Sequence, residues 1–410
     1  MEYKKRIYCA ICKNKNLIDV VFLGKVPLAG NFPKQEEIPQ VKKYDLFLQM
    51  CEKCSLVQTD SIIDSDILFR DYRYMSSIGL SEHFTNVAKL LKKKFQLNKS
   101  HKILEIGSND GVLLKPLMDL SLNVIGIEPA INISKIAKEK GCNVINDYFN
   151  EKNAQKYFKN QKFDLVISNN CFAHIDDIHS IVKGTKDILK EDSYFIIEVH
   201  YLKNLIDELQ YDFIYHEHLY YYSLNALHNL FKQFNMSIID FNEIDIHSGS
   251  IRVYIQNTPN KMPKKVLDRL KLEKKEGMTK SKSFINFGQL IKEHKQGINK
   301  EIRTLKEKGY KVAAFGASGR GNMLLNMCGL TNNEIDYVVD ESPERVNRYI
   351  AGVNIPIVKL SHLLKNPPDY IFILAWNYFD MIKDKLEVLG FKDLKYILPF
   401  PKPNSKIKQT

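Results

Sequence analysis

Long apolar runs are missing from this chain of 410 residues, and none reaches the roughly 20 residues that a membrane-spanning helix needs. The first residues, Met-Glu-Tyr-Lys-Lys-Arg, do not lead into the apolar core of a signal peptide. We therefore expect a cytoplasmic protein with no membrane partner. Thiols stay reduced in the cytoplasm, so paired cysteines there indicate metal ligands more readily than disulfides.

Short repeats, low-complexity tracts and segments that mix basic with aromatic residues are missing as well. The net charge is +12, but the lysines are scattered, which is typical of solvated faces and does not favour a nucleic-acid partner. A positive sum still suits an anionic substrate such as a sugar nucleotide. Hydrophobic residues make up 44% of the chain, enough for two or three domain cores.

Strand-like and helix-like segments alternate in two regions, which predicts an α/β fold. The first alternation spans about residues 80 to 255 and predicts a doubly wound parallel sheet; the second spans the last hundred residues and predicts a smaller α/β domain. Apolar residues at helical spacing between Phe284 and Leu305 predict a helix that joins the two. The predicted strands of the two regions are 102–106, 123–127, 163–168, 193–199, 236–241, 250–256, 311–315, 335–339 and 370–375.

Two Cys-x-x-Cys pairs lie near the N-terminus, Cys9 with Cys12 and Cys51 with Cys54. Four thiolates complete a tetrahedral zinc shell and leave no open position for water, so the predicted zinc is structural. The 38 residues between the pairs exceed the spacing of simple zinc ribbons, and the pairs are therefore expected to clamp a small subdomain.

A glycine turn that follows a strand and opens a helix carries the main cofactor signal. Glycines there let the backbone approach a cofactor closely, and the turn supplies N–H groups. The absence of a clean Gly-x-Gly-x-x-Gly favours S-adenosylmethionine (SAM) over NAD. The residues of this turn assigned to the cofactor are Glu105, Gly107, Asn109, Asp110 and Gly111.

Four acidic or amide residues after later strands are expected to complete this cleft. Glu128 ends the next predicted strand, where it is placed to accept hydrogen bonds from ribose hydroxyls. Asp147 is a candidate for the adenine amine. Asn169 and Asn170 come just past the predicted strand 163–168 and would line the same cleft at the carboxyl edge of the sheet.

Acid, base and phenol groups are dense between Tyr211 and Tyr222. Carbon methylation needs a carbanion equivalent: a base removes a proton beside a ketone, and hydrogen-bond donors stabilise the enolate oxygen. Histidine is a natural base near neutral pH, and tyrosine is a suitable donor. An aromatic packing segment with surface histidines is the alternative. A metal site at His216 and His218 is a third interpretation, but the second histidine of His-Glu-x-x-His is missing.

A second glycine turn, Phe-Gly-Ala-Ser-Gly-Arg-Gly-Asn, opens a helix in the C-terminal region and contains Ser318, Arg320 and Asn322. A helix N-terminus beside an arginine can take a phosphate, so contact with a sugar diphosphate or with the sugar is expected. A purely structural turn is the alternative.

Together these motifs resemble those of the sugar C-methyltransferase family, which acts on nucleotide-linked 4-keto-deoxysugars in antibiotic and bacterial surface-glycan pathways. The resemblance runs nearly end to end, and Tyr-His-Glu-His combined with the second glycine turn is its specific part. It also includes the cysteine pairs, Tyr72-Arg-Tyr74-Met-Ser-Ser, Leu-Glu-Ile-Gly-Ser-Asn-Asp-Gly and Asn-Asn-Cys-Phe-Ala-His-Ile.

The resemblance implies a SAM-dependent C-methyltransferase with His218 as the base at C3 of the sugar. Tyr215, Glu217 and His174 would support that base, and Tyr72 would lie near cofactor and substrate. The substrate contacts it suggests are Tyr74, Tyr222, His247, Ser318, Arg320 and Asn322.

The predicted parts are a zinc-binding module at 1–65, a Rossmann-like SAM methyltransferase domain at 66–258, a helical linker at 259–310 and a C-terminal Rossmann-like domain at 311–410. The implied partner is a nucleoside-diphosphate keto-sugar, and the expected protein is a monomer or weak dimer. The alternatives are an NAD-dependent sugar-nucleotide oxidoreductase or epimerase-like enzyme and a zinc-dependent nucleic-acid-binding protein.

Overall fold

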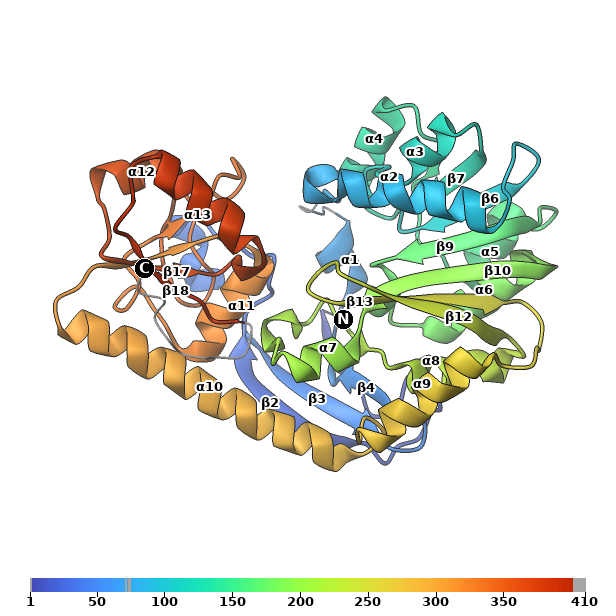
Figure 1. The fold of residues 1–410 in the computed structure, drawn as a ribbon, viewed down its shortest axis with the longest axis horizontal. Helices are drawn as coiled ribbons and strands as arrows, with labels where there is room; N and C mark the ends of the chain where they lie inside the picture. Colours follow the sequence, from blue (N-terminus) through green and yellow to red (C-terminus); the bar gives the residue numbers. More distant parts are fainter. Residues whose placement is uncertain (1, 71, 73–74, 401–410) are drawn as a thin grey trace.

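Two lobes face each other across a central N-terminal segment (Figure 1). The computed structural model describes residues 2–70, 72 and 75–400, so the predicted substrate contact Tyr74 lies outside the described residues. Within the described residues, strands form four sheets of two, seven, four and five strands. No helix of the described ranges is long and apolar enough to cross a membrane.

The larger lobe is built on the seven-stranded sheet, in the order β12-β13-β10-β9-β6-β7-β8. Strands β10, β9, β6, β7 and β8 run parallel, and β13 is antiparallel to both of its neighbours. The predicted α/β class is thereby confirmed for this lobe. The strands are β6 (Lys102–Ile106), β7 (Asn123–Ile127), β8 (Val144–Ile145), β9 (Phe163–Asn169), β10 (Leu189–His200), β12 (Ser237–Ile244) and β13 (Ser250–Gln256).

Helices cover both faces of this sheet with separate apolar cores. One core contains buried side chains of α2 (Ser77–Lys94), α3 (Leu114–Asp119) and α4 (Ile131–Glu139). The other contains those of α5 (Glu151–Phe158), α6 (Ile178–Ile188), α8 (Leu224–Phe231) and α9 (Lys264–Lys275).

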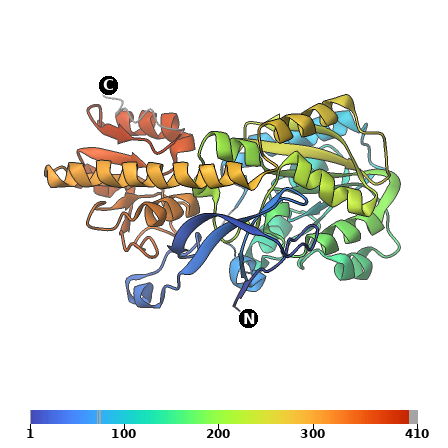
Figure 2. The ribbon, with the colours of Figure 1, turned by 90° about the horizontal axis from the view of Figure 1, so that it is seen from below.

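The smaller lobe holds five parallel strands in the order β16-β15-β14-β17-β18. The long helix α10 (Ser281–Glu307) runs along it and spans towards the larger lobe (Figures 1 and 2). Seven of its apolar or imidazole side chains are buried, as the helical spacing predicts. The other elements are β14 (Val312–Phe315), α11 (Gly319–Cys328), β15 (Val338–Val339), β16 (Ile357–Val358), α12 (Leu360–Lys365), β17 (Tyr370–Ile373), α13 (Phe379–Val388) and β18 (Lys395–Ile397).

The N-terminal segment forms a four-stranded antiparallel sheet whose outer strand comes from the middle of the chain. Its order is β11-β4-β3-β2, and β11 (Tyr220–Tyr221) pairs Tyr220 with Gln58 and Tyr221 with Val57. The N-terminal segment contains the strands β1 (Tyr3–Lys5), β2 (Ile18–Val26), β3 (Tyr44–Cys51), β4 (Leu56–Thr59) and β5 (Ser61–Ile63), of which β1 and β5 form the two-stranded sheet.

This segment joins the two lobes through their cores. The cysteine end packs into the core of the larger lobe, while apolar residues of β2 and β3 share one core with α10 and the five-stranded sheet. Contact with α10 is close, because a Cβ placed on Gly288 would lie 3.1 Å from the carbonyl oxygen of Val20. Removal of this segment would expose both cores to water, and the free-energy cost would be about 25 cal/mol for each Å² of apolar surface exposed.

Candidate active site

A single cavity of about 930 Å³ lies where the carboxyl ends of β6, β7 and β9 face the smaller lobe. Its walls come from the larger lobe, from the N-terminal loop 28–32 and from the start of α11. The cavity gathers most of the site residues predicted from the sequence. Those that line it are Tyr72, Glu105, Gly107, Asn109, Glu128, Asn169, Asn170, His174, Tyr215, Glu217, His218, His247, Ser318 and Arg320.

The glycine turn is shaped by close contacts beneath it. Gly107 has φ +71°, and a Cβ there would collide with the side chain of Cys171. Gly111 has φ +80°, and its Cβ would lie 2.8 Å from the Cys142 sulfur. Only glycine meets both demands at no steric cost. Gly111 is absent from the cavity lining, so its contribution is to the packing of the turn.

Glu128 fixes this turn at the end of β7. Its Oε2 accepts from the N–H of Asn109, and its Oε1 accepts from the N–H of Ala130, both at 2.9 Å. Burial raises the pKa of Glu128, and these two N–H donors oppose that rise. The carboxylate is therefore held at the mouth of the cavity in a fixed orientation.

Several polar side chains in the cavity wall have atoms without a hydrogen-bond partner among the described residues, and two of these side chains belong to the predicted cofactor residues. They are the Asn169 amide, at both its oxygen and its nitrogen, and the Glu105 carboxyl, at Oε2. Burial raises the pKa of Glu105 well above its usual value, and the Glu128 charge adds to the rise. Buried polar atoms that lack partners are costly, and a polar ligand in the cleft would satisfy them. These residues thus fit a nucleoside cofactor such as SAM.

Two predicted cofactor residues are engaged elsewhere. Asp110 lies beneath the turn, where its carboxylate accepts from the Ser77 hydroxyl and from Lys140 Nζ at 2.8 Å. Asp147 accepts from the Tyr157 hydroxyl at 2.7 Å, and it does not line the cavity, although Tyr148, Phe149 and Asn150 do. The structure thus places both carboxylates against protein donors.

His218 lies at the centre of the cavity wall with a defined orientation. Its Nδ1 is 2.8 Å from the carbonyl oxygen of Phe213, and its Nε2 is 2.9 Å from the Tyr215 hydroxyl. A carbonyl only accepts, so Nδ1 carries the proton and the lone pair of Nε2 points toward Tyr215. Burial lowers the pKa of His218 well below its usual value, and the neighbouring His174 imidazole lowers it further. The imidazole is therefore neutral at pH 7.

The segment around His218 is held by three parts of the chain. Strand β11 begins two residues after it and pairs with β4 of the N-terminal sheet. The N–H of Leu219 donates to Ala173 O at 2.9 Å in the larger lobe. The 3₁₀ turn η3 (Tyr211–Phe213), which precedes it, contacts the smaller lobe. Several separate contacts therefore fix the imidazole.

His174 contacts the imidazole, and Glu217 lies in the same cavity wall. His174 Nδ1 is 2.7 Å from the carbonyl oxygen of Glu217, and its ring centroid lies 4.8 Å from that of His218. Burial raises the pKa of Glu217 to about 7. Its Oε1 accepts from the Gly30 N–H at 3.4 Å, while Oε2 has no partner among the described residues. Burial also raises the pKa of Tyr215 well above its usual value, which keeps the phenol protonated.

The other predicted substrate residues divide between wall and scaffold. Asn322 does not line the cavity; its amide donates to carbonyl oxygens of Leu28, Ala29 and Asn31, which holds loop 28–32 against α11. Tyr222 is fully buried outside the lining and packs on Phe172 with ring centroids 5.5 Å apart.

Ser318, Arg320 and His216 each have protein partners. Ser318 caps α11 by accepting from the N–H of Gly321 at 3.1 Å. Arg320 forms an ion pair with Asp212 at 2.7 Å. His216 lies outside the lining, with Nε2 3.4 Å from Asp45 O, so it does not face the same space as His218.

The four cysteines form one cluster whose sulfur atoms all lie within 4.8 Å of one another. Sulfur pairs are 3.3 Å apart for Cys9 and Cys54 and 3.5 Å apart for Cys12 and Cys51. A tetrahedral ion with Zn–S bonds of about 2.3 Å needs sulfurs about 3.8 Å apart, so the cluster fits zinc. A residue with positive φ follows each pair, Lys13 at +56° and Ser55 at +66°, so both pairs end in the same turn. Four sulfur ligands leave zinc no catalytic position.

The sheet order, with its antiparallel strand β13 inserted beside β10, and the cleft at the carboxyl ends define a SAM-dependent methyltransferase. Three family models cover nearly the whole chain: a zinc binding domain at residues 9–69, a methyltransferase domain at 70–240 and a C-methyltransferase C-terminal domain at 245–401. The chain is 30% identical over 401 residues to the C-methyltransferase NovU of Streptomyces niveus, and the matched region covers 96% of both proteins. It therefore belongs to the C-methyltransferase family, as its motifs predict, and uses SAM with a zinc-binding N-terminal domain.

Other similarities are confined to the methyltransferase part. The ubiquinone biosynthesis O-methyltransferase of Glaesserella parasuis is 27% identical over 103 residues, which are 23% of this chain and 44% of that protein. The solved structure of magnesium protoporphyrin IX methyltransferase from Synechocystis with bound SAM has 12% identity and a TM-score of 0.34, and covers 44% of this chain and 80% of that one. Family membership over the whole chain decides in favour of the methyltransferase over the oxidoreductase and nucleic-acid-binding alternatives.

Several residues of the cavity wall and its support were not predicted as site residues from their sequence. Loop 28–32 has no motif, and Cys171 and Asp212 lie within quoted segments without being named as site residues, because each acts through a partner far along the chain. One signal was available for Asp212, since it lies within the dense segment between Tyr211 and Tyr222.

Proposed function

We propose that this enzyme methylates C3 of a nucleotide-linked 4-keto-deoxysugar, with His218 as the base that removes the C3 proton. The observation that carries the proposal is the His218 imidazole, held with an unprotonated Nε2 beside the Tyr215 hydroxyl at the wall of the cavity that also contains Glu128 and Asn169. The family resemblance and the net charge of +12 support an anionic sugar nucleotide as the substrate. Four reduced thiols at the zinc site support a cytoplasmic location.

The residues of this chain would hold the cofactor through Glu128 at the ribose and Asn169 in the wall, next to the backbone of Gly107. Bound SAM would supply an electrophilic methyl group on a sulfonium. The Asn169 amide would gain the partners it lacks among the described residues. Tyr148 and Phe149, rather than Asp147, line the part of the cavity where the adenine of the cofactor would lie.

The proton step follows from the hydrogen bonds around His218. The carbonyl of Phe213 keeps the proton on Nδ1, so Nε2 is free to accept the proton from C3 once the Tyr215 hydroxyl turns away. The electron pair of the broken C–H bond then moves onto the ketone oxygen. Tyr215, still a protonated phenol, would donate to that oxygen, and the carbon becomes nucleophilic enough to take a methyl group. Removal of the base would cost about 10²- to 10⁴-fold in rate.

The experiment separates proton removal from methyl transfer. Candidate nucleoside-diphosphate 4-keto-sugars are incubated in D₂O without SAM, and mass spectrometry follows deuterium entry at C3. A second incubation with isotope-labelled SAM follows methylation. We expect His218→Asn to lose both while its calorimetric SAM affinity is retained.

His228→Asn, on α8 outside the cavity lining, is the matched control and should keep both rates. Full deuterium exchange and turnover in His218→Asn would remove His218 as the base. Methylation at a nitrogen or oxygen of every accepted substrate would reject the reaction itself.

A further inference from the structure

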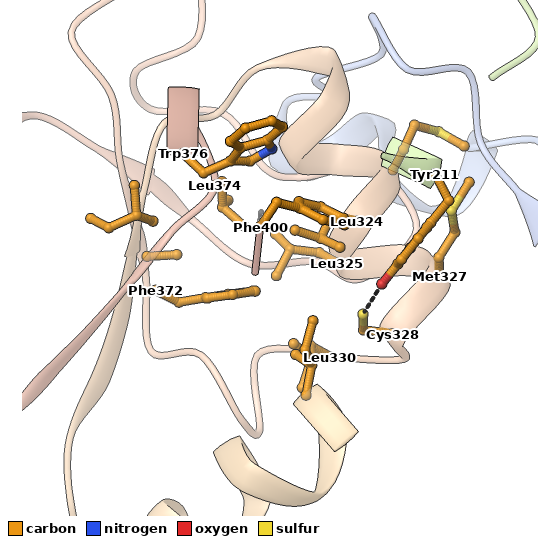
Figure 3. Packing of buried hydrophobic residues seen from close by; sticks show 14 of the residues in the cluster. Tyr211, Leu324, Leu325, Met327, Cys328, Leu330, Phe372, Leu374, Trp376 and Phe400 are labelled. Carbon is orange, nitrogen blue, oxygen red and sulfur yellow. Dashed lines mark hydrogen bonds between the residues drawn. The ribbon is translucent and has the colours of Figure 1, made fainter. Parts of the chain in front are cut away.

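Each of the three residues of η3 contacts the smaller lobe. The Tyr211 hydroxyl is 3.1 Å from His294 Nδ1 on α10 and 3.6 Å from the Cys328 sulfur on α11. Figure 3 shows the Tyr211 ring beside Met327, with its hydroxyl directed at Cys328. Phe213 completes the set, because its ring lies under a guanidinium from α11. The turn is therefore anchored in a lobe that is distant from it in sequence.

Asp212 is the most constrained member of the turn. Its side chain is 0% exposed, and its Oδ2 accepts from Arg320 Nε at 2.9 Å and from Trp376 Nε1 at 3.0 Å. Charged groups are rarely buried without a partner, since desolvation costs several kcal/mol per ion. Asp212 therefore holds its place only while Arg320 stays beside it.

Arg320 is occupied on its edge and on its face. Besides the ion pair, its guanidinium carbon lies 3.7 Å from the centroid of the Phe213 ring and 4.9 Å from that of Trp376. Its NH1 lies 3.4 Å from the Asn377 side-chain oxygen. A guanidinium stacked and paired in this way is fixed in position and has few donors left for a phosphate.

The held turn bears directly on His218. Phe213, whose ring lies under Arg320, is the residue whose carbonyl accepts the proton of His218 Nδ1 at 2.8 Å. That bond decides which ring nitrogen carries the proton, and hence whether Nε2 is bare. A shift of about 1 Å at such a contact is enough to cost on the order of 100-fold in rate.

We propose that Asp212 and Arg320 are positioning residues, which set the tautomer of the His218 imidazole through the Phe213 carbonyl. The smaller lobe thereby helps to set the protonation pattern of His218, in addition to forming part of the cavity wall. The effect on rate rests on the proposed function of His218, whereas the effect on the tautomer does not depend on it.

The test measures the tautomer directly. Enzyme with ¹⁵N-labelled histidine, zinc-loaded and full length, is studied by long-range ¹H–¹⁵N correlation NMR, and the His218 signal is assigned by its loss in His218→Asn. We expect wild type to show a protonated Nδ1 and a bare Nε2. Asp212→Asn should show a mixture of tautomers and about a 10- to 100-fold lower kcat with an unchanged KM for SAM.

Two further variants guard against loss of folding. Trp376→Phe removes the indole N–H from Asp212 while it keeps an aromatic ring beside Arg320, and should shift the tautomer in the same direction by a smaller amount. Leu363→Ala removes a fully buried side chain of α12 in the same lobe and should lower Tm without changing the tautomer.

A folded Asp212→Asn enzyme with the wild-type tautomer overturns the proposal. So does a tautomer change of equal size in Leu363→Ala, which would reduce the effect to general destabilisation. The His218→Asn exchange experiment decides separately whether His218 is the base.

Discussion

Replacement of Glu217 by glutamine should make the protein more stable at neutral pH and leave it little changed in acid. Glu217 is 9% exposed, and its Oε2 has no hydrogen-bond partner among the described residues. Burial favours the neutral acid, so the folded protein binds the proton of Glu217 more tightly than the unfolded chain does. Glutamine keeps the shape of that neutral form and does not ionise.

The magnitude follows from the pKa of Glu217, which burial raises from an ordinary value of 4.5 to about 7. A difference of about 2.5 pH units corresponds to about 3.5 kcal/mol, at about 1.4 kcal/mol per unit. Because the folded pKa is raised, the stabilisation is fully present below pH 4.5 and is lost as the pH rises through about 7. Between about pH 5.5 and about pH 7.5 the loss in the free energy of unfolding is about 2 kcal/mol.

The assay is urea unfolding of zinc-loaded enzyme without SAM, at several values of pH across that interval. The free energy of unfolding of Glu217→Gln minus that of wild type should grow by about 2 kcal/mol from the acid end to the neutral end. Glu139→Gln, an exposed carboxylate at the end of α4, is the matched control and should show no such growth. A constant difference for Glu217→Gln, or one that shrinks with pH, would refute the assigned burial of the charge.

Two other predictions concern the metal and the cofactor turn. Cys54→Ser should lower the zinc content below one ion per chain and lower Tm by several degrees, because the cysteine cluster packs into the core of the larger lobe. The control Cys142→Ser, outside the cluster, should keep its zinc in elemental analysis. Full zinc content in Cys54→Ser would contradict the four-sulfur site. Gly107→Ala should weaken calorimetric SAM binding at least about tenfold, since the new methyl meets Cys171 and φ is +71°. Gly141→Ala, with φ +82° and nothing within 4 Å of its Cβ, carries the backbone strain alone and should bind normally; equal losses in both variants would assign the effect to backbone strain.

Much of the larger lobe could be predicted from local sequence. Strands β6 and β7 have the predicted bounds, because runs of isoleucine, valine and leucine end there at a glycine or a proline. The predicted strand 335–339 is shortened to Val338–Val339, and β16 and β18 were not predicted. These short strands exist through pairing with neighbours in the sheet, and local propensity carries little information about such pairing.

The site could be predicted as far as its motifs extend. The glycine turn and the Tyr-His-Glu-His segment lie on the cavity, as their patterns indicate. Asp147 and Asn322 lie outside the cavity lining: the Tyr157 hydroxyl donates to the Asp147 carboxylate, and the Asn322 amide donates to carbonyl oxygens of loop 28–32, contacts that local sequence did not indicate. The strand β11 had no signal at all, because its partner β4 lies about 160 residues earlier in the chain. The bounds of the four predicted parts of the chain stay predictions.

Strand β11, which the middle of the chain contributes to the N-terminal sheet, has a practical consequence for engineering. A chimaera that exchanges only residues before about 65 would pair Tyr220 and Tyr221 with a β4 strand from another protein, so the segment that holds His218 would pack against a non-native strand. Recombination of such enzymes to alter their substrate preference should therefore transfer β2 to β4 together with residues 211–222 as one unit.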